Sequence, residues 1–259
     1  MQFLKTFFAW LFPKKHPLIS LIAASRGRLP LLAKFLHSAF YNASSPDQVE
    51  VILVTDNDDR ETANFLKNWK KHHGTCNLMV LRRLRSSNIN RDYVNYGAVK
   101  ASGKYVWGLG NDVEIDQKNY DKAIEQEIEG FLRDKPDRLV YVFVKDDVNG
   151  GEMNGRFSSF PIFTKEVVDT IQAIMPNEIT GWGADGVCFG IWKNLICDRI
   201  YVSGTIKLIH YCHHNGRMER DEISHNMQKC SSNTALHKED AQKYINKLNN
   251  RILEYAAKI

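Results

Sequence analysis

Carboxylate side chains gather directly after one short apolar run of the chain. The run 104–110 has the β-branched and aromatic content of a buried strand. Three acids follow it at alternate positions, with an amide alongside: Asp112, Glu114, Asp116 and Asn111. Neighbouring carboxylates repel one another unless a cation lies close to them, and hard oxygen ligands suit Mg²⁺ or Mn²⁺, which in turn bridge a diphosphate. We therefore predict that Asp112 and Glu114 bind one divalent cation.

Two earlier apolar runs also end in polar side chains. The first, 17–25, leads into Arg26 and Arg28, and the second leads into Asp56. In an open α/β sheet, ligands bind beyond the carboxyl ends of the strands, so these loops should meet at one crevice. Arg26 and Arg28 would contact phosphate there. The alternatives are that both arginines are ordinary surface residues and that Asp56 caps a helix or lies in a turn. We assign the ligand contacts of the first loop to Ala24, Ser25, Arg26 and Arg28.

Strand and helix patterns alternate through the first half of the chain. Apolar runs bounded by turn residues indicate strands at 17–25, 49–59, 76–84 and 104–110. Amphipathic segments between them indicate helices at 29–43, 61–74 and 91–103. This alternation is typical of an α/β fold with a mixed, mostly parallel central sheet, right-handed crossovers and helices on both faces.

The second half of the chain is less regular. Helices are predicted at 120–135, 164–175, 183–195 and 238–259, and strands at 138–147 and 200–214. A Gly- and Asn-rich stretch, 148–159, indicates a loop. Since we find no repeat and no long linker, we predict one compact domain over 17–259 after an amphipathic segment, 1–16.

The composition is that of a soluble globular protein and does not identify a binding partner. Of the 259 residues, 43% are hydrophobic and 25% are charged, as in a soluble globular protein with a core. The net charge is +5, and ten Lys or Arg but only two acids lie between Arg60 and Lys104. Such a segment suits a phosphate-rich ligand, nucleic acid, an anionic membrane or a solvated face. The five cysteines form no CxxC pair, which argues against a zinc site and suits a reducing cytoplasm.

The first fifteen residues are aromatic and end in Pro13, Lys14 and Lys15. Their apolar run is well short of the roughly 20 residues that span a bilayer, and a signal peptide fits poorly because the charges follow the apolar run. A helix lying in a membrane interface and a helix docked on the protein's own surface both fit. We predict a cytoplasmic protein with peripheral membrane contact through residues 1–15.

The segment 95–116 resembles part of the family-2-like glycosyltransferases. Those enzymes often read Arg-Asn-x-Gly, then Ala-x-Gly-x-Tyr, then an apolar strand and an Asp-x-Asp triplet. The matching positions here are Asn95, Gly97, Ala101, Gly103, Tyr105 and Asp112. The resemblance covers residues 17–116 well and continues more loosely to about 226. It implies a GT-A (Rossmann-like) fold, a nucleotide-sugar-binding half, 17–116, and an acceptor half, 117–259. It also implies donor contacts by Asp56, Asn95 and Asn111, with Asp56 holding the base.

The looser part of the resemblance concerns the second half of the chain. The segment 179–192 is similar to the Trp-x-x-Asp region that supplies a carboxylate facing the acceptor, and Asp185 occupies the place of that carboxylate. Trp182, beside a glycine, suits stacking on a sugar ring. His210 matches a late histidine near the metal or diphosphate, with His213 and His214 as competitors. Here the triplet is Asp-Val-Glu and the frequent Glu-Asp pair is Ala-Asp. Core packing of Trp182, helix capping by Asp185 and a simply hydrogen-bonded His210 are the alternatives.

Together these features predict a metal-dependent glycosyltransferase. The predicted cation, Mn²⁺ or Mg²⁺, lies on Asp112, Glu114 and His210, the donor is a UDP- or GDP-sugar, and Asp185 is the base. The acceptor is a surface glycan or a lipid-linked sugar, or else a modified base in DNA. A nucleotidyltransferase would need a Gly-rich phosphate loop, and neither G-x-G-x-x-G nor a P-loop is present. A nucleotide-binding module without turnover is the remaining alternative.

Overall fold

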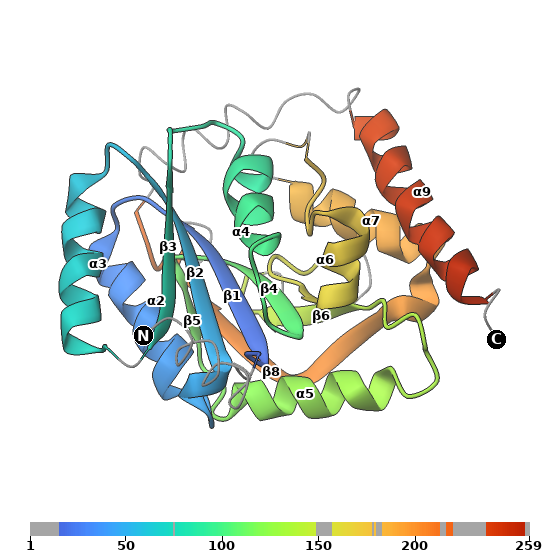
Figure 1. Ribbon diagram of the computed structural model, residues 1–259, viewed down its shortest axis with the longest axis horizontal. Coiled ribbons are helices and arrows are strands. Elements are labelled where there is room, and N and C mark those ends of the chain that lie inside the picture. Colours follow the sequence, from blue (N-terminus) through green and yellow to red (C-terminus); the bar gives the residue numbers. More distant parts are fainter. Residues whose placement is uncertain are drawn as a thin grey trace, which may run out of the picture.

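One mixed β-sheet forms the centre of the protein. The structure is a computed structural model and describes residues 16–74, 76–148, 157–177, 179, 183–212, 216–219 and 237–256. The strands within these residues are β1 Ile19–Ser25, β2 Val49–Asp56, β3 Asn77–Arg83, β4 Tyr105–Gly110, β5 Val113–Ile115, β6 Tyr141–Asp146, β7 Ile162–Thr164 and β8 Ile200–His210. They form one eight-stranded sheet in the order β3-β2-β1-β4-β7-β6-β8-β5 (Figure 1).

Six of these eight described strands point the same way. β1 pairs in parallel with β2 and β4, β2 with β3, and β6 with β8. β7 lies antiparallel between β4 and β6, and β5 is antiparallel to β8. At the end of β1, Ala24 lies beside both Val54 and Gly110. The carboxyl ends of the six parallel strands therefore share one edge of the sheet, and β5 begins at that edge.

Helices cover both faces of the sheet (Figure 1). Their bounds are α2 Leu29–Tyr41, α3 Arg60–His72, α4 Tyr96–Ala98, α5 Tyr120–Phe131, α6 Lys165–Ile171, α7 Ala184–Leu195 and α9 His237–Ala256. Shorter turns are η1 Pro46–Gln48, the π-helical η2 Asn90–Asn95, and η3 Cys197–Arg199. Helices α2, α3 and α5 share one hydrophobic cluster with the sheet, whereas η2, α4, α6, α7 and α9 share the other. In the described part of the chain, no helix combines the length and apolar character needed to cross a membrane.

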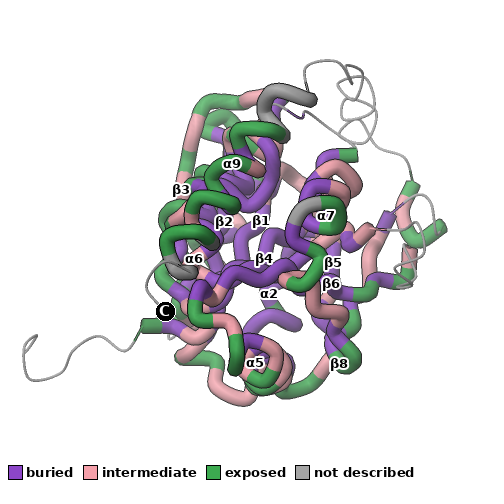
Figure 2. The backbone as a smooth tube through the Cα atoms, turned by 90° about the vertical axis from the view of Figure 1, so that its right-hand side faces the viewer, coloured by how far each residue is buried: buried purple, intermediate pink, exposed green. Residues whose placement is uncertain are grey.

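The central strands are buried on both faces. Along β1, Leu21 belongs to one cluster and Ile22 to the other, as the alternation of a strand requires. Figure 2 shows the central strands in the buried interior, whereas the peripheral helices expose one side. Strands covered on both faces read as continuous apolar runs, and this is why β1, β2 and β4 could be recognised from the sequence.

Two glycines of the 95–116 segment allow close packing onto this sheet. A Cβ at Gly97 would lie 2.5 Å from Ile22 Cγ2, and one at Gly103 would lie 2.6 Å from the backbone nitrogen of Ser20. A side chain at Gly97 would press α4 away from β1, and one at Gly103 would press the turn before β4 away from β1. The two glycines therefore set how closely α4 and the start of β4 lie against β1, which ends at the candidate site.

The predicted arrangement of elements differs from the structure in three places. The helix predicted at 91–103 begins as a π-helix, and the helix predicted at 164–175 ends at Ile171, because Gln172 takes the left-handed conformation at φ 62°. The three-residue strands β5 and β7 were not predicted, since they are too short to show an alternating pattern. The predicted segment 1–15 and most of the predicted loop 148–159 lie outside the described residues.

Candidate functional site

The loop after β1 is fixed in an unusual backbone conformation. Gly27 and Arg28 both adopt left-handed dihedrals, with φ of 57° and 51°. The N–H of Gly27 donates to Asp59 Oδ2 at 2.9 Å and to Thr62 Oγ1 at 3.0 Å. Asp59 also caps α3 by accepting from the Thr62 N–H at 3.0 Å. These hydrogen bonds attach the loop to the start of α3, and they fix the backbone from which the Arg26 and Arg28 side chains extend.

Arg26 joins the carboxylates that end β2. Its Nη1 lies 2.8 Å from Asp56 Oδ2 and 2.7 Å from Asp58 Oδ1. The Tyr93 hydroxyl donates to the other oxygen of Asp56, which is 2% exposed. Burial and the bond to Asp56 raise the pKa of Tyr93 to about 12, and the Arg26 hydrogen bond lowers the pKa of Asp58. Both carboxylate oxygens of Asp56 therefore already have a hydrogen-bond partner inside the protein. The base contact predicted for it stays a prediction.

Asp112 lies just beyond β4 and is paired with Arg28. The distance from Arg28 Nη1 to Asp112 Oδ2 is 2.9 Å, and the two side chains are 13% and 18% exposed. A Cβ at Gly110 would overlap Asp112 Oδ1, so the glycine makes room for this carboxylate. Within the described chain, Asp112 Oδ1 accepts no hydrogen bond. Asn111 donates to Ser25 Oγ at 3.2 Å, which joins the ends of β1 and β4.

Glu114, on β5, has a different partner from Asp112. The Tyr211 hydroxyl donates to Glu114 Oε2 at 2.6 Å and accepts from Lys34 Nζ at 3.2 Å. The Lys34 ammonium also lies 4.3 Å from the centroid of the Tyr211 ring. The hydrogen bond to Glu114 raises the pKa of Tyr211. The backbone N–H of Tyr211 donates to the Asp112 carbonyl at 2.8 Å, so this tyrosine joins the end of β8 to both acids.

The three residues predicted as metal ligands are not assembled into one cluster. His210 donates its backbone N–H to Asp147 Oδ1 at 2.9 Å, and its ring packs edge-on against Phe160 at 4.9 Å. Among the described residues, no group of three or more His, Cys, Asp or Glu side chains could hold a metal ion. Mg²⁺ commonly binds one or two carboxylates together with substrate phosphates rather than a complete protein cage. The available oxygen of Asp112 fits such a partial site.

Asp185 occupies the first turn of α7, after Gly183 at φ 96°. The side chain is half-buried, and its Oδ1 accepts from the Gly186 N–H at 2.9 Å. Burial raises the pKa of Asp185 to about 6, and the charge of Asp146 at the end of β6 contributes in the same direction. A carboxylate with a pKa close to neutral is suited to accept a proton from a hydroxyl group.

Asn95 takes part in a structural hydrogen-bond network. Its Oδ1 accepts from the N–H groups of Ile174 and Met175 at 2.9 and 3.0 Å. Its Nδ2 donates to the Met175 carbonyl at 2.7 Å and to Asn177 Oδ1 at 2.9 Å. An amide makes about four such bonds at most, so this side chain has no capacity left for a ligand in the present arrangement. The donor contact predicted for Asn95 is not supported by this geometry.

The remaining predicted residues divide into two groups. Ala24 and Ser25 lie at the end of β1, where Ala24 is paired with Gly110 of β4 and Ser25 Oγ accepts from Asn111, just beyond that strand. Trp182, with the competitors His213 and His214, lies outside the described residues.

Other side chains of the site were not predicted, namely Lys34, Tyr93, Asp146, Asp147 and Tyr211. The acids at 146 and 147 follow an apolar run, as Asp56 and Asp112 do, and that signal could have identified them. Lys34 and Tyr93 lie within helical segments and have no comparable signal.

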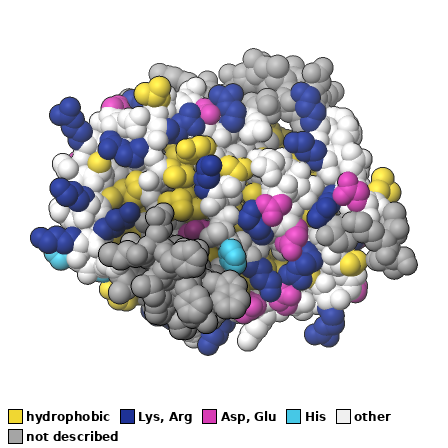
Figure 3. Space-filling view, in the orientation of Figure 1, with side chains coloured by type: hydrophobic (Ala, Val, Ile, Leu, Met, Phe, Trp, Pro, Cys, Tyr) yellow, Lys and Arg dark blue, Asp and Glu magenta, His cyan; other side chains and the backbone are white. Residues whose placement is uncertain are grey.

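The basic residues of the stretch 60–104 divide into some that form ion pairs within the fold and some that are exposed on its surface. Arg83 pairs with Asp92 at 3.2 Å and Lys104 with Glu129 at 3.0 Å, so part of its charge is used inside the fold. Three lysines of α3 are exposed: Lys67, Lys70 and Lys71. Figure 3 shows Lys and Arg side chains on the side of the molecule where α3 lies. This surface is open to an anionic partner, and its geometry does not select one.

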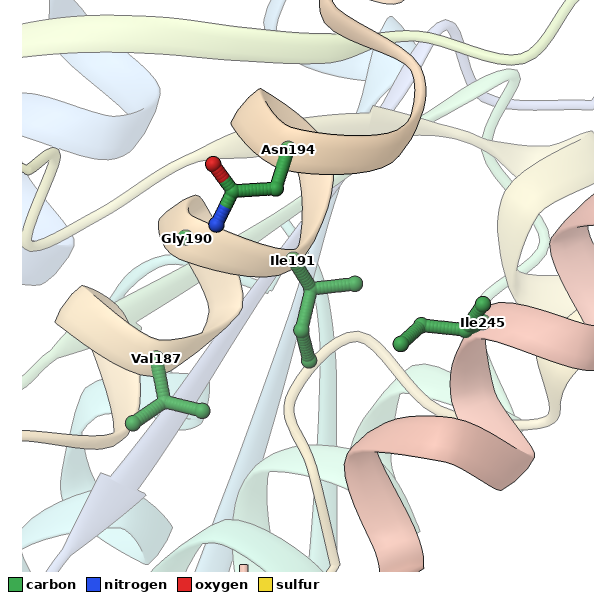
Figure 4. A pocket seen from close by; sticks show the side chains of 5 residues that line it. All are labelled: Val187, Gly190, Ile191, Asn194 and Ile245. Atoms are coloured by element: carbon green, nitrogen blue, oxygen red, sulfur yellow. The ribbon is translucent and has the colours of Figure 1, made fainter. Parts of the chain in front are cut away.

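An apolar groove lies apart from these charges, between α7 and α9. Its volume is about 310 Å³, and it is lined by Val187, Gly190, Ile191, Asn194 and Ile245 (Figure 4). The lining contains no ionisable side chain. A phosphate-bearing ligand would find no charge complement in this lining, so the edge of the sheet where the parallel strands end is the better candidate site.

Comparisons with known proteins identify the family and the fold of the chain. The sequence profile of glycosyl transferase family 2 matches residues 20–181. The mannosyltransferase PcManGT from Pyrobaculum calidifontis, in complex with GDP-Man and Mn²⁺, has a TM-score of 0.59 at 14% identity, covering 96% of this chain and 81% of that chain. S. aureus TarS 1-349 has a TM-score of 0.56 at 17% identity, covering 88% and 71%. Its complex with UDP-GlcNAc has a TM-score of 0.54 at 16% identity, covering 88% and 72%. No curated protein matches the sequence. The likeness confirms the predicted GT-A fold.

Proposed function

Because the chain belongs to glycosyl transferase family 2 and is a glycosyltransferase, we propose that it moves a sugar from a nucleoside-diphosphate sugar to an acceptor hydroxyl with the help of a divalent cation. The observation that carries this proposal is the pairing of Asp112 with Arg28 where β1 and β4 end side by side. A carboxylate with one available oxygen and a guanidinium group at the same point offer complementary contacts to a cation and a diphosphate.

The donor extends along the shared edge of the sheet. The nucleoside lies by the loop of Arg26 and Asp56, and the diphosphate lies by Arg28 and Asp112. Two proteins of similar fold support a donor of this class, since they were solved with GDP-Man and with UDP-GlcNAc. For this chain we propose a UDP- or GDP-sugar. The hydrogen bond from Asn111 to Ser25 holds the ends of β1 and β4 together beside it.

Asp112 is the residue that would hold the cation, Mn²⁺ or Mg²⁺, with Glu114 as a supporting carboxylate whose Oε2 already accepts from Tyr211. Bound there, the cation neutralises charge that develops on the departing nucleoside diphosphate. The protein itself contributes the Arg28 guanidinium group, which would donate hydrogen bonds to the phosphate oxygens of the departing nucleoside diphosphate. The Tyr211 hydroxyl, bound to Glu114 and close to Lys34, fixes the position of the acid on β5.

Asp185 is the proposed general base. Its carboxylate would accept the proton of the acceptor hydroxyl while the hydroxyl oxygen attacks the anomeric carbon of the donor sugar. A pKa of about 6 leaves most of the carboxylate ionised at neutral pH and still basic enough to take part in proton transfer. Gly186 orients the acid by donating its N–H to one carboxylate oxygen.

The proposed acceptor is a surface glycan or a lipid-linked sugar. The aromatic and basic segment 1–15, which lies outside the described residues, supports contact with a membrane where such acceptors reside. Association with liposomes that is lost when residues 1–15 are deleted is the expected result. Salt-sensitive binding to duplex or single-stranded DNA would instead favour a modified DNA base, which the exposed lysines of α3 would serve.

A donor screen tests the function itself. Thermal unfolding would be followed with UDP-, GDP-, CMP- and dTDP-sugars, each with and without Mn²⁺, because a ligand that binds the folded state raises its stability. We expect one nucleotide class to raise the melting temperature, with a larger rise when Mn²⁺ is present. Slow hydrolysis of that donor without acceptor should follow and should be abolished in Asp112→Asn. No shift with any donor would contradict the proposal.

A further inference from the structure

The carboxylate proposed to hold the cation already has a positively charged partner in the protein. Arg28 Nη1 lies 2.9 Å from Asp112 Oδ2, and both side chains are mostly shielded from water, at 13% and 18% exposure. Ion pairs with little exposure are screened less by solvent and salt than surface pairs. A dication arriving at Asp112 would therefore meet a neighbouring positive charge that competes for the same carboxylate.

The backbone holds Arg28 at this point. Its φ of 51° and ψ of 39° are left-handed, which residues other than glycine seldom adopt. Strained conformations of this kind persist where the surrounding structure enforces them, and they gather at functional sites. The preceding residue is fixed as well, since the Gly27 N–H donates to Asp59 Oδ2 and Thr62 Oγ1. The side chain can thus change partner while its backbone remains fixed.

We propose that Arg28 couples the binding of donor and cation, an inference that rests on the function proposed above. In the free enzyme, Arg28 occupies Asp112 and lowers its affinity for a cation. When a donor binds, its diphosphate supplies anionic oxygens that take over the guanidinium group, and the oxygen of Asp112 that Arg28 held becomes available to the cation as well. Breaking the ion pair costs free energy, and the ligand that binds first supplies it. The second ligand then binds without that cost, so each ligand strengthens the binding of the other by the same factor.

The test compares Mn²⁺ binding to the full-length wild type and to Arg28→Gln by calorimetry, with and without UDP or GDP. In the wild type, we expect weak Mn²⁺ binding that the nucleotide strengthens. In Arg28→Gln, Mn²⁺ without nucleotide should bind about tenfold more tightly than in the wild type, and the strengthening by nucleotide should shrink by about the same factor. A merely structural role for Arg28 would not raise the affinity for the metal.

Arg26→Gln is the matched control, because Arg26 comes from the same loop and contacts Asp56 and Asp58 instead of Asp112. Its affinity for Mn²⁺ alone should equal that of the wild type. Arg28→Lys, which keeps the positive charge, should retain the weak binding of the wild type. Arg28→Gln that binds Mn²⁺ no more tightly than the wild type would overturn the inference.

The outcomes separate this inference from the proposed function. If Asp112→Asn loses the nucleotide-dependent Mn²⁺ binding while Arg28→Gln matches the wild type, the function stands and the coupling role of Arg28 is refuted. If the wild type binds neither nucleotide nor Mn²⁺, the function is contradicted and the inference with it.

Should Arg28→Gln fail to fold, arginine side-chain NMR of the wild type replaces the variant. The Nε signal of Arg28 should shift when UDP or GDP is added, whereas that of Arg138, paired with Glu129 and Glu166 before β6, should not. An unmoved Arg28 signal with nucleotide bound would overturn the inference.

Discussion

Asp56 is the last residue of β2 and Asp112 lies just beyond β4, the two strands that flank β1. Each pairs with an arginine of the loop after β1, yet their surroundings differ. Asp56 is 2% exposed and holds Arg26 on one oxygen and Tyr93 on the other. Asp112 is 18% exposed at its side chain, and within the described residues Arg28 contacts only one of its oxygens. Both carboxylate oxygens are therefore held beside β2, where Tyr93 supplements the ion pair, whereas among the described residues one oxygen of Asp112 beside β4 is left without a hydrogen bond.

Asp112→Asn should have the largest effect of the variants that separate the two acids. The substitution keeps the size of the side chain but removes the charge that a cation requires, so we expect activity to fall about 10³-fold. Initial rates of sugar transfer at saturating donor would measure it, with thermal unfolding as a check that the fold is intact. Activity within tenfold of the wild type would place the cation elsewhere.

Asp185→Asn should lower activity about 10²-fold, because the amide cannot accept the proton of the acceptor. In the wild type, kcat/KM should fall as the pH drops below about 6, where Asp185 becomes protonated. The variant should lack this acidic limb. A pH profile that is identical in wild type and variant would assign the base to another residue.

The same substitution should raise stability at neutral pH. The pKa of Asp185 rises from 3.8 to about 6 on folding, so between these values the folded state binds more protons than the unfolded state. Asp185 therefore contributes to the stability of the folded state at pH values below 3.8, and this contribution is lost as the pH rises through about 6. We expect Asp185→Asn to unfold at a higher temperature than the wild type at pH 8 and to show no such advantage at pH 4. A lower melting temperature at pH 8 would contradict this reasoning.

Asp56→Ala should cost more stability than Asp112→Ala, which sharpens the contrast between the two acids. Removing Asp56 leaves the Tyr93 hydroxyl without an acceptor and takes one carboxylate from Arg26, for a loss of about 2 kcal/mol in the free energy of unfolding. Asp112→Ala should cost about half as much, because its carboxylate is more exposed and has fewer partners. Urea unfolding of both variants checks the order, and equal losses would remove the distinction.

Glu114→Gln should have the smallest effect. Its carboxylate accepts from Tyr211, and an amide oxygen at the same position can still accept that bond. We expect activity to fall less than about tenfold, which is far less than for Asp112→Asn, and Tyr211→Phe to behave similarly. Equal losses in Glu114→Gln and Asp112→Asn would instead support the prediction that both acids bind the cation directly.

Much of the fold could be predicted from the sequence, because its strands are buried on both faces and end in distinctive polar residues. β1, β2 and β4 read as continuous apolar runs, and the acids and arginines that follow them do meet at one edge of the sheet. Local pattern was sufficient there, since each strand and its terminal residues are neighbours in the sequence.

The partners of these residues could not be predicted, since they come from distant parts of the chain. Glu114 was predicted to share a cation with Asp112, which stays a prediction, and nothing in the sequence indicated that its side chain bonds Tyr211, 97 residues further on. Asn95 was assigned to the donor through a motif, whereas its amide holds the segment of Ile174 and Met175. The spacing of a motif identifies which residues lie near a site, and tertiary contacts decide which of them remain available to a ligand.

A crystal of the protein grown with Mn²⁺ and its preferred nucleoside diphosphate would test the central claim most directly. An anomalous difference peak should lie at bonding distance from an Asp112 carboxylate oxygen and from the diphosphate. A bound nucleotide with no manganese at Asp112, or manganese held by other residues, would contradict the account.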